Sequence, residues 1–241
     1  MVLWQFPFID GVAMHRSVPL FIIALALIAG LIVSAGCMQA SVSPQDAGIQ
    51  NATGSESVLS TVPDVRQSQP YSCGAACLLA IFNYWGIDMR EGVLMQELNT
   101  TEEAGTSPDA IVRVARAHGL QAALRTNLTL ADLERSLANR TPVIIDCQAW
   151  SDTSPANISW EDDWEDGHYM IVIGLDAENV YFEDPSQLGT RGVIPRQEFI
   201  SRWHDYEGPA PFNANSTPMY HAGIFISGSK SANYPTFTHV D

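Results

Sequence analysis

The sequence predicts an α+β protein in which helices come first and an antiparallel sheet follows. Residues 73–119 carry apolar side chains at helical spacing, in segments that end at glycines. From residue 142 onward the apolar runs are short, rich in β-branched residues and separated by turn residues, as strands are. Hydrophobic residues make up 46% of the 241 residues, which is enough to build one ordinary domain with a real core.

Three helices are expected in the first half of the domain. Residues 73–85 are apolar at most positions, which predicts a buried helix, and Gly86 suits the C′ position that ends it. An amphipathic helix should follow at 90–98. The third helix should begin after Ser107, an N-cap residue followed by proline, and should end near Gly119.

The second half of the domain should contribute most of the strands. The run TLAD at 129–132 resembles a capping box and opens a helix. The apolar run HYMIVIG and the run VYFE should pair as a hairpin. In chain order we expect strand 120–125, helix 129–139, strand 142–147, strands 168–174 and 180–183, strand 192–194, helix 196–203 and a last strand at 220–226.

The charge balance excludes several classes of protein. The formal net charge is -15 and the chain has a single lysine, Lys230, so nucleic acids and anionic membrane surfaces should repel it. No glycine-lysine pair occurs, which excludes nucleotide hydrolysis through a Walker-type loop. The histidines and cysteines lack zinc-site spacing, and the acids at 161–166 lack calcium-loop spacing. We therefore expect no nucleic acid, nucleotide, metal or organic cofactor.

The N-terminal segment has the layout of a targeting signal. Residues 18–36 are strongly apolar, no charged residue occurs at 17–45, and His15 and Arg16 precede the run. This pattern is typical of a signal peptide or a signal anchor, and its length just suffices to span a bilayer. The basic flank should stay inside, so that the rest of the chain is extracytoplasmic.

The end of this apolar segment resembles a lipoprotein processing site, because small residues are followed by Cys37. Cys37 would then carry lipid, and an uncleaved anchor is the alternative. We divide the chain into a signal peptide or membrane anchor at 1–37, a flexible linker at 38–62, one domain at 63–227 and a loose tail at 228–241.

Cys73 is the first candidate for chemistry, because it stands where an apolar helix begins, in the stretch QSQPYSCGAAC. Unpaired N–H groups and the dipole at a helix N-terminus stabilise a thiolate and lower its pKa. Gly74 would let a substrate approach the backbone there, and Gln67 could donate to an oxyanion. The plainer alternatives are a buried structural thiol for Cys73 and an ordinary loop amide for Gln67.

The base would be a histidine from elsewhere in the chain. His168 differs from the other histidines because it opens an apolar strand at the rim of the predicted sheet. Asp184 ends the partner strand before a proline and could orient the imidazole. Both side chains must then share one face of the hairpin, which requires an odd-length loop, such as a five-residue turn at 175–179, or a β-bulge. The alternatives are a satisfied strand histidine and an ordinary turn aspartate.

These residues together resemble a known family. Gln67 six residues before Cys73, the run CGAACLLAIFNYWG, then GHYMIVIG and VYFEDPS are similar to the bacteriocin-processing cysteine peptidases, which remove double-glycine leaders at the front of bacteriocin exporters. The similarity covers about residues 62–205. It implies a papain-like cysteine peptidase fold, in which the helix that carries the nucleophile packs on an antiparallel sheet. It also implies that Cys73 is the nucleophile, His168 the base, Asp184 its orienting residue and Gln67 a part of the oxyanion hole.

The sequence also departs from that family. No ATPase or multi-span membrane domain is recognisable, so we expect a stand-alone domain. A long acidic insertion at 151–166 should lie beside His168. It is interpreted as a solvated loop, with the alternative that Trp160 and Trp164 shape a rim for the substrate. The reaction class therefore carries over better than the double-glycine specificity.

Taken together, these features predict an extracytoplasmic, membrane-tethered cysteine peptidase that acts on peptides or proteins. The negative charge of the chain should draw in basic substrates faster. Two alternatives stay open, namely acyl transfer by the same thiol and a non-catalytic surface module that binds peptides. Cys77 is expected in the core, and a disulfide between Cys77 and Cys147 is left open.

Overall fold

The structure is a computed structural model, and it describes residues 61–150 and 159–229. The predicted signal segment at 18–36, Cys37, most of the predicted linker and nearly all of the predicted tail lie outside these residues. Within them, no helix has both the length and the apolar character needed to cross a membrane.

An antiparallel sheet forms the centre of the described part. It has six strands in the order β1-β8-β2-β3-β4-β5. Two further strands pair separately as β6 and β7. The bounds are β1 Gln121–Arg125, β2 Val143–Gln148, β3 Gly167–Leu175, β4 Asn179–Glu183, β5 Gly192–Pro195, β6 His204–Glu207, β7 Thr217–Tyr220 and β8 Gly223–Ser227.

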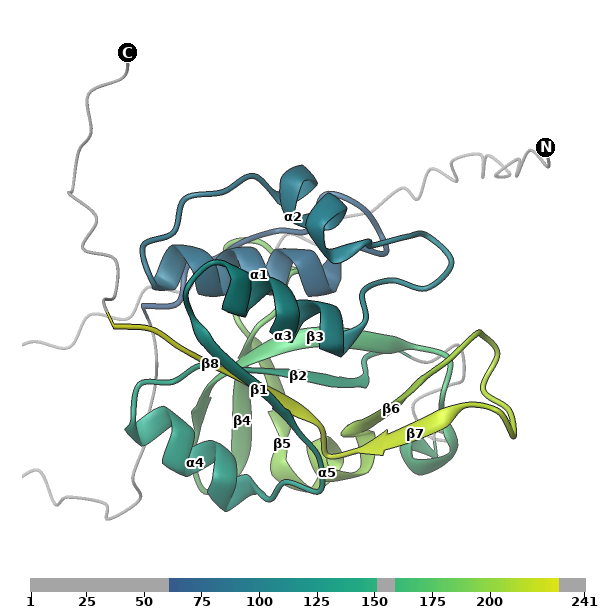
Figure 1. The fold of residues 1–241 in the computed structure, drawn as a ribbon. Coiled ribbons are helices and arrows are strands. Elements are labelled where there is room, and N and C mark those ends of the chain that lie inside the picture. Colours follow the sequence, from purple (N-terminus) through teal and green to yellow (C-terminus); the bar gives the residue numbers. More distant parts are fainter. Residues whose placement is uncertain (1–60, 151–158, 230–241) are drawn as a thin grey trace, which may run out of the picture. The chain divides into compact units, whose positions relative to one another are not determined.

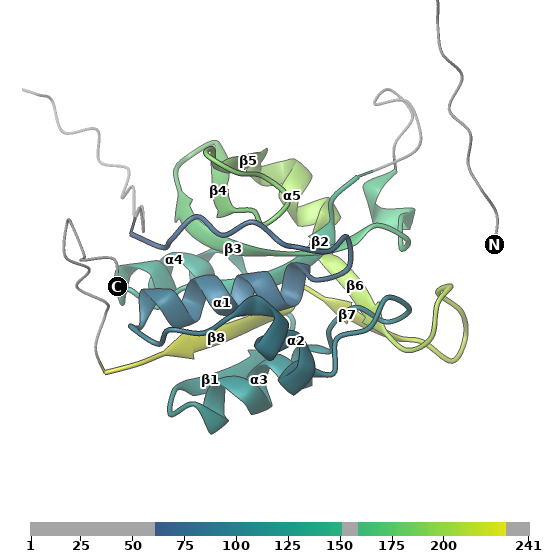
Figure 2. The same ribbon diagram turned by 90° about the horizontal axis from the view of Figure 1, so that it is seen from above.

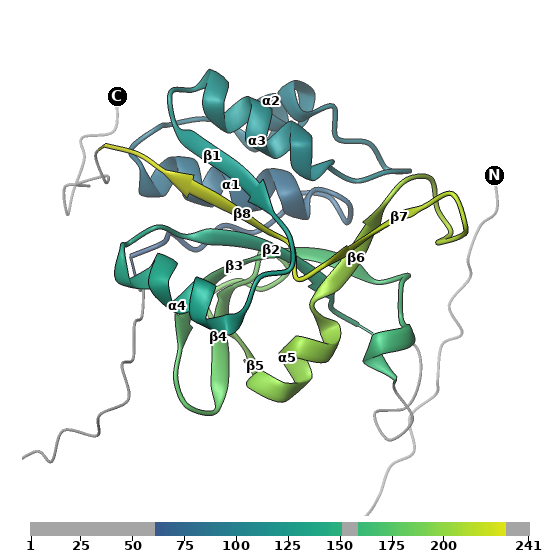
Figure 3. The same ribbon diagram turned by 60° about the horizontal axis from the view of Figure 1, so that its bottom comes forward.

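The helices lie on both sides of this sheet. The helices α1, α2 and α3 lie together on one side, and α4 and α5 lie on the other (Figures 1 and 3). Helix α1 runs along β3, and α3 contacts β1 and β8 (Figure 2). This arrangement confirms the predicted α+β fold, in which an N-terminal helical part packs on an antiparallel sheet. The bounds are α1 Cys73–Tyr84, α2 Glu91–Leu98, α3 Pro108–Ala117, α4 Leu130–Ala138 and α5 Arg196–Arg202, with a short 3-10 helix η2 at Trp160–Asp162.

Helix α1 is buried because its sequence, CGAACLLAIFNY, is apolar on almost every side. It ends as expected at Gly86, whose φ is +78°. At its start, Ser72 makes no capping bond to the first turn. The Ser72 hydroxyl donates instead to Glu91 Oε1 of α2 at 2.7 Å. No cap side chain therefore occupies the N–H groups at the start of α1, and they can serve other acceptors.

Helix α4 begins as the sequence predicts, with a capping box. The Thr129 hydroxyl accepts from the Asp132 N–H at 3.3 Å, and the Thr129 N–H donates to Asp132 Oδ2 at 2.8 Å. Apart from the last strand, the predicted elements are present, with ends that differ by one or two residues.

The prediction of the last strand, at 220–226, is wrong. We expected one strand at 220–226, but β7 and β8 are separate strands. His221 lies between them with a φ of +48°, which an extended strand does not contain. Its N–H donates to Trp203 O at 2.9 Å, and its ring stacks on Trp203 with centroids 4.9 Å apart. The break allows β7 to pair with β6, a strand that begins at His204 and was not predicted.

Candidate active site

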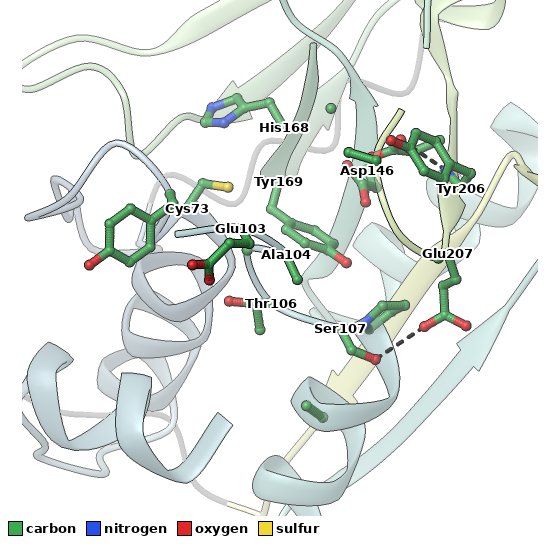
Figure 4. Close-up of a pocket in the computed structure, with 18 of the residues that line it drawn as sticks. Cys73, Glu103, Ala104, Thr106, Ser107, Asp146, His168, Tyr169, Tyr206 and Glu207 are labelled. Atoms are coloured by element: carbon green, nitrogen blue, oxygen red, sulfur yellow. Dashed lines mark hydrogen bonds between the residues drawn. The ribbon is translucent and has the colours of Figure 1, made fainter. Parts of the chain in front are cut away.

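Cys73 is the first residue of α1, and its side chain lies beside the ring of His168 (Figure 4). A hydrogen bond joins the Cys73 sulfur to the His168 side chain, and the backbone N–H groups of Tyr169 and Gly74 donate to it. Burial raises the pKa of Cys73, but these hydrogen bonds and the positive charge of His168 outweigh burial and hold the pKa below its usual value. The surroundings of Cys73 therefore favour the thiolate.

His168 lies on β3 directly after Gly167 and is 2% exposed. Its Nε2 is 2.8 Å from Oδ1 of Asp184, the residue after β4, which leaves Nδ1 for the Cys73 thiol. Burial lowers the pKa of His168, but the hydrogen bonds and negative charges of Asp184 and Cys73 raise it to about 9. Burial raises the pKa of Asp184, while the hydrogen bonds from His168 and the Ser186 N–H hold it below its usual value. The structure thus joins three of the four predicted site residues in one hydrogen-bonded series.

A β-bulge in the β3–β4 hairpin brings His168 and Asp184 onto one face of the sheet. The register shifts by one residue between Val172 and Gly174. Without that shift, strand alternation would turn Asp184 to the face opposite His168. The turn between the paired ends, 176–179, has an even number of residues. The bulge, and not a five-residue turn, therefore meets the geometric requirement of the sequence analysis.

Gly74 is a glycine for a packing reason. A Cβ at this position would lie 2.8 Å from Thr106 Cβ and 3.1 Å from Tyr169 Cδ2. Because Gly74 is buried against these side chains, it does not open the backbone to a substrate as we expected. It allows the start of α1 to approach β3 closely.

Gln67 is tied to the loop after β4 by its backbone, since its N–H donates to Pro185 O at 2.9 Å. Its side-chain Nε2 donates to the carbonyl oxygens of Gln69 and Pro70, at 2.8 and 3.1 Å. Gln67 Oε1 is buried and has no hydrogen-bond partner among the residues described. Loop carbonyls therefore occupy the amide N–H groups of Gln67, and Gln67 is outside the pocket that Cys73 and His168 line.

This pocket has a volume of about 960 Å³ (Figure 4). One wall is the segment 102–110, which leads into α3. The opposite wall is formed by the ends of β2 and β3 and by residues 205–210 of β6 and the loop after it. A cavity of this size, with the Cys73 thiol in its wall, can hold a segment of peptide.

The pocket contains a polar group that the sequence analysis did not single out. Asp146 on β2 lies directly opposite Tyr169 on β3, and the side chain of Asp205 on β6 is hydrogen-bonded to that of Asp146. Burial and the negative charge of Asp205 raise the pKa of Asp146 well above its usual value, and burial raises the pKa of Asp205 too. In the sequence, Asp146 could have been noticed as an aspartate inside the apolar run VIIDCQ, which forms a buried strand. No comparable sequence pattern marked Asp205.

Aromatic side chains surround the catalytic candidates. Trp150 lines the pocket and contacts His168, with ring centroids 4.7 Å apart. Trp164 also lines the pocket and stacks on Phe212 at a centroid distance of 4.2 Å. Trp160 packs elsewhere, with its ring centroid 4.0 Å from the Arg202 guanidinium. Of the two tryptophans proposed for a substrate rim, only Trp164 therefore lies at the pocket.

The other two cysteines of the described part are buried in the core. Cys77 is in the core, as expected, and its thiol donates to Tyr169 O at 3.3 Å. Cys77 and Cys147 are both buried free thiols, so they form no disulfide with each other. Within residues 61–150 and 159–229, no group of three or more His, Cys, Asp or Glu side chains could hold a metal ion.

A cysteine at the N-terminus of a buried helix, set against a histidine on an antiparallel sheet, defines the papain-like class of cysteine peptidase folds. Within that class the chain belongs to the Peptidase_C39 like family, whose model matches residues 59–211. This match covers more than half of the chain and confirms the family resemblance drawn from the motifs around Cys73 and His168.

The chain is also similar to other proteins and to solved structures. An uncharacterised protein of Methanothermobacter thermautotrophicus is 29% identical over 138 residues, which cover 57% of this chain and 80% of that protein. A structure from Bacillus anthracis described as a C39-like peptidase matches with a TM-score of 0.53 at 18% identity, over 73% of this chain and 98% of that one. The peptidase domain of Streptococcus ComA, a bifunctional ABC transporter of a quorum-sensing pathway, gives a TM-score of 0.48 at 19% identity, over 68% of this chain and 97% of that one. The Bacillus anthracis structure supports the fold.

Proposed function

We propose that this chain is a cysteine peptidase with Cys73 as nucleophile, His168 as general acid and base, and Asp184 as the residue that orients His168. The observation that carries the proposal is the series of hydrogen bonds from the Cys73 thiol through His168 to Asp184. The series supplies the thiolate, the proton donor and the orienting carboxylate that nucleophilic catalysis by cysteine requires.

The reaction proceeds in two halves. The Cys73 thiolate attacks the carbonyl carbon of the peptide bond, and the His168 imidazolium gives its proton to the leaving amine as the C–N bond breaks. The acyl group is then held on the sulfur as a thioester. Water attacks the thioester while His168 takes up one of its protons, which releases the carboxylic acid and restores the thiolate–imidazolium pair.

The oxyanion of each tetrahedral intermediate needs N–H donors. The uncapped start of α1 supplies the backbone N–H of Cys73. Gln67 adds a second donor when its amide turns away from the carbonyl oxygens of Gln69 and Pro70. We assign this turn to substrate binding.

The peptidase acts outside the cytoplasm in this proposal, tethered by its N-terminal segment. The apolar run at 18–36 and its basic flank support export. Fractionation of cells and mass spectrometry of the N-terminal peptide test the tether. Lipid on Cys37 or an intact anchor in the membrane fraction supports it, and an unlipidated chain in the soluble fraction contradicts it.

Alkylation of Cys73 across a pH series tests the chemistry without a known substrate. Iodoacetamide should modify Cys73 rapidly well below the ordinary thiol pKa of about 8.5. Burial raises the pKa values of Cys77 and Cys147, so these thiols are slow internal controls. His168→Ala should slow the reaction at acidic pH by about tenfold or more, because the thiolate loses its counterion. If Cys73 reacts only as an ordinary thiol, the peptidase proposal fails and the peptide-binding module replaces it.

Product analysis separates hydrolysis from acyl transfer. A peptide substrate is incubated with the protein in the presence of an added amine. Hydrolysis yields the free carboxylic acid, whereas an amide with the added amine would show acyl transfer by the same thiol.

A further inference from the structure

Two carboxyl groups, those of Asp146 and Asp205, lie in the pocket wall near Cys73, and among the described residues neither is paired with a lysine or an arginine. Asp146 is 7% exposed, and its Oδ1 has no hydrogen-bond donor in the described part of the chain. Neither Asp146 nor Asp205 takes part in an ion pair among the described residues. Two buried carboxylates side by side are costly, so the pair holds a shared proton in the absence of a ligand.

The chain makes room for this pair directly beside His168. A Cβ on Gly167 would lie 2.8 Å from Asp205 Cγ, so the carboxyl group of Asp205 fills the space that a side chain before His168 would take. Asp146 approaches from β2, across from Tyr169. Both carboxyl groups and Cys73 line the same pocket, in which Figure 4 labels Asp146 and Cys73. A substrate bound at the thiol therefore occupies the same pocket as the pair.

The rest of the pocket is acidic as well. Among the described residues that line it, Arg113 is the one lysine or arginine, and its guanidinium already donates to Glu97 O at 2.8 Å. Such a lining attracts cations and repels acidic segments. The further carboxylates of the lining are Glu102, Glu103, Asp109, Glu165 and Glu207.

We propose that Asp146 and Asp205 form a subsite for a positively charged side chain of the substrate, a lysine or an arginine close to the bond that Cys73 attacks. This inference rests on the proposed peptidase function and names its substrate class. The incoming ammonium or guanidinium donates to Asp146 Oδ1 and replaces the shared proton, which leaves to solvent. An arginine fork can bridge both carboxylates, whereas a pair of glycines would leave Asp146 Oδ1 without a donor.

Cleavage profiling with the full chain tests the subsite. A library of synthetic peptides is incubated with the protein, and the cleaved bonds are mapped by mass spectrometry. Lysine or arginine should recur at one fixed position, with kcat/KM about tenfold or more above that of the norleucine or citrulline analogue. Equal cleavage of charged and neutral analogues overturns the subsite. Each peptide is tested with a free and with an acetylated N-terminus. A preference that persists after acetylation is due to the side-chain cation, and one that is lost is due to the terminal amine and overturns the subsite.

The matched variants are designed around the shared proton. A single Asp→Asn change removes the shared proton but leaves the other carboxylate ionised, so a cation could still bind. Asp146→Asn and Asp205→Asn are therefore combined in one double variant. Thermal unfolding checks that this double variant folds. The double variant should lose the preference for cationic peptides, and retention of that preference overturns the subsite. Glu178→Gln is the control, because it removes one exposed charge from the turn at the other end of the β3–β4 hairpin. This control should keep the preference.

A second measurement does not require turnover. The cationic reagent 2-bromoethylammonium and the neutral reagent iodoacetamide both alkylate thiols. The ratio of their rate constants at Cys73 should be about fivefold higher in the wild type than in the double variant, and equal ratios overturn the subsite. If Cys73 is not activated and no peptide is cleaved, the proposed function itself fails. If Cys73 is activated and cleaves peptides without a charge preference, only the subsite fails.

Discussion

At the scale of single residues, the proposed activity depends on a proton that Cys73 and His168 would exchange. The pKa of Cys73 is below its usual value, and that of His168 is raised to about 9. Between these two pKa values the thiolate and the imidazolium coexist, each stabilising the other's charge. Asp184 stabilises the imidazolium of His168 from the side of the ring opposite Cys73, because its negative charge and its hydrogen bond favour the protonated ring.

Asp184→Asn should narrow the pH range of activity from both sides. Asparagine keeps an oxygen for His168 Nε2 but lacks the charge, so the pKa of His168 falls from about 9 and the alkaline limb moves to lower pH. A less basic His168 stabilises the thiolate less, so the pKa of Cys73 rises and the acidic limb moves to higher pH. The pH profile of kcat/KM for a peptide found by profiling measures both limbs. Unchanged limbs in a folded variant would show that the charge of Asp184 does not set the pKa of His168.

At the scale of elements, the helices α1 and α4 differ in how the N–H groups of their first turn are capped. Helix α4 has a complete capping box at Thr129 and Asp132, which satisfies its first N–H groups internally. Helix α1 has Ser72 at the same position, yet this side chain is used to reach Glu91 of α2. The open start of α1 is where Cys73 lies. The element that carries the proposed nucleophile therefore keeps its positive end available.

The contact between α1 and β3 should be sensitive to a single methyl group. Gly74→Ala places a Cβ 2.8 Å from Thr106 Cβ and 3.1 Å from Tyr169 Cδ2, so we expect the free energy of unfolding to fall by about 1–3 kcal/mol. Gly92→Ala in α2 is the control, since nothing lies within 4 Å of its Cβ. It should be neutral or stabilising by up to about 1 kcal/mol. Urea unfolding measures both variants, and an equal effect at the two positions would refute the packing account of Gly74.

At the scale of the whole molecule, the charge of the chain and the lining of the pocket have the same sign. The net charge of -15 acts over long distances on any approaching peptide. The carboxyl pair acts only on a cation that has entered the pocket. The two effects are separable because salt screens exposed charges more strongly than buried ones.

Salt should therefore reduce the cleavage of cationic peptides without abolishing the preference for them. Between low salt and about 0.5 M salt, kcat/KM for a lysine or arginine peptide should fall several-fold, as steering is screened over a Debye length that shrinks below about 8 Å. The neutral analogue should change little. Measurements of both peptides over a salt series check this expectation. If the preference disappears completely at high salt, it arises from the overall negative charge of the protein and not from Asp146 and Asp205.

Much of the fold could be predicted, and three of the four candidate site residues could be selected, because their signals are local. A continuous apolar run bounded by Gly86 defines α1, with Cys73 at its start. The apolar runs before and after residues 176–179 define the hairpin that carries His168 and Asp184. The family resemblance rests on the same short motifs. Hydrophobic periodicity, caps and turn residues depend on neighbours in the chain, so they can be identified without knowledge of the packing.

Only the tertiary structure decided how distant segments meet. The backbone break at His221 and the buried contact of Gly74 each depend on a partner far along the chain, Trp203 for His221 and Tyr169 for Gly74. The bulge between Val172 and Gly174 lies within one hairpin, but no turn signal in the sequence marks it. Asp146 and Asp205 are 59 positions apart in numbering, and only the meeting of β2 and β6 makes them a pair. The sequence by itself determined most of the elements, the family and the candidates for the reactive residues. Packing decided the shape and charge of the pocket. The side chains that form it come from distant parts of the chain, and no local sequence pattern shows that they will meet.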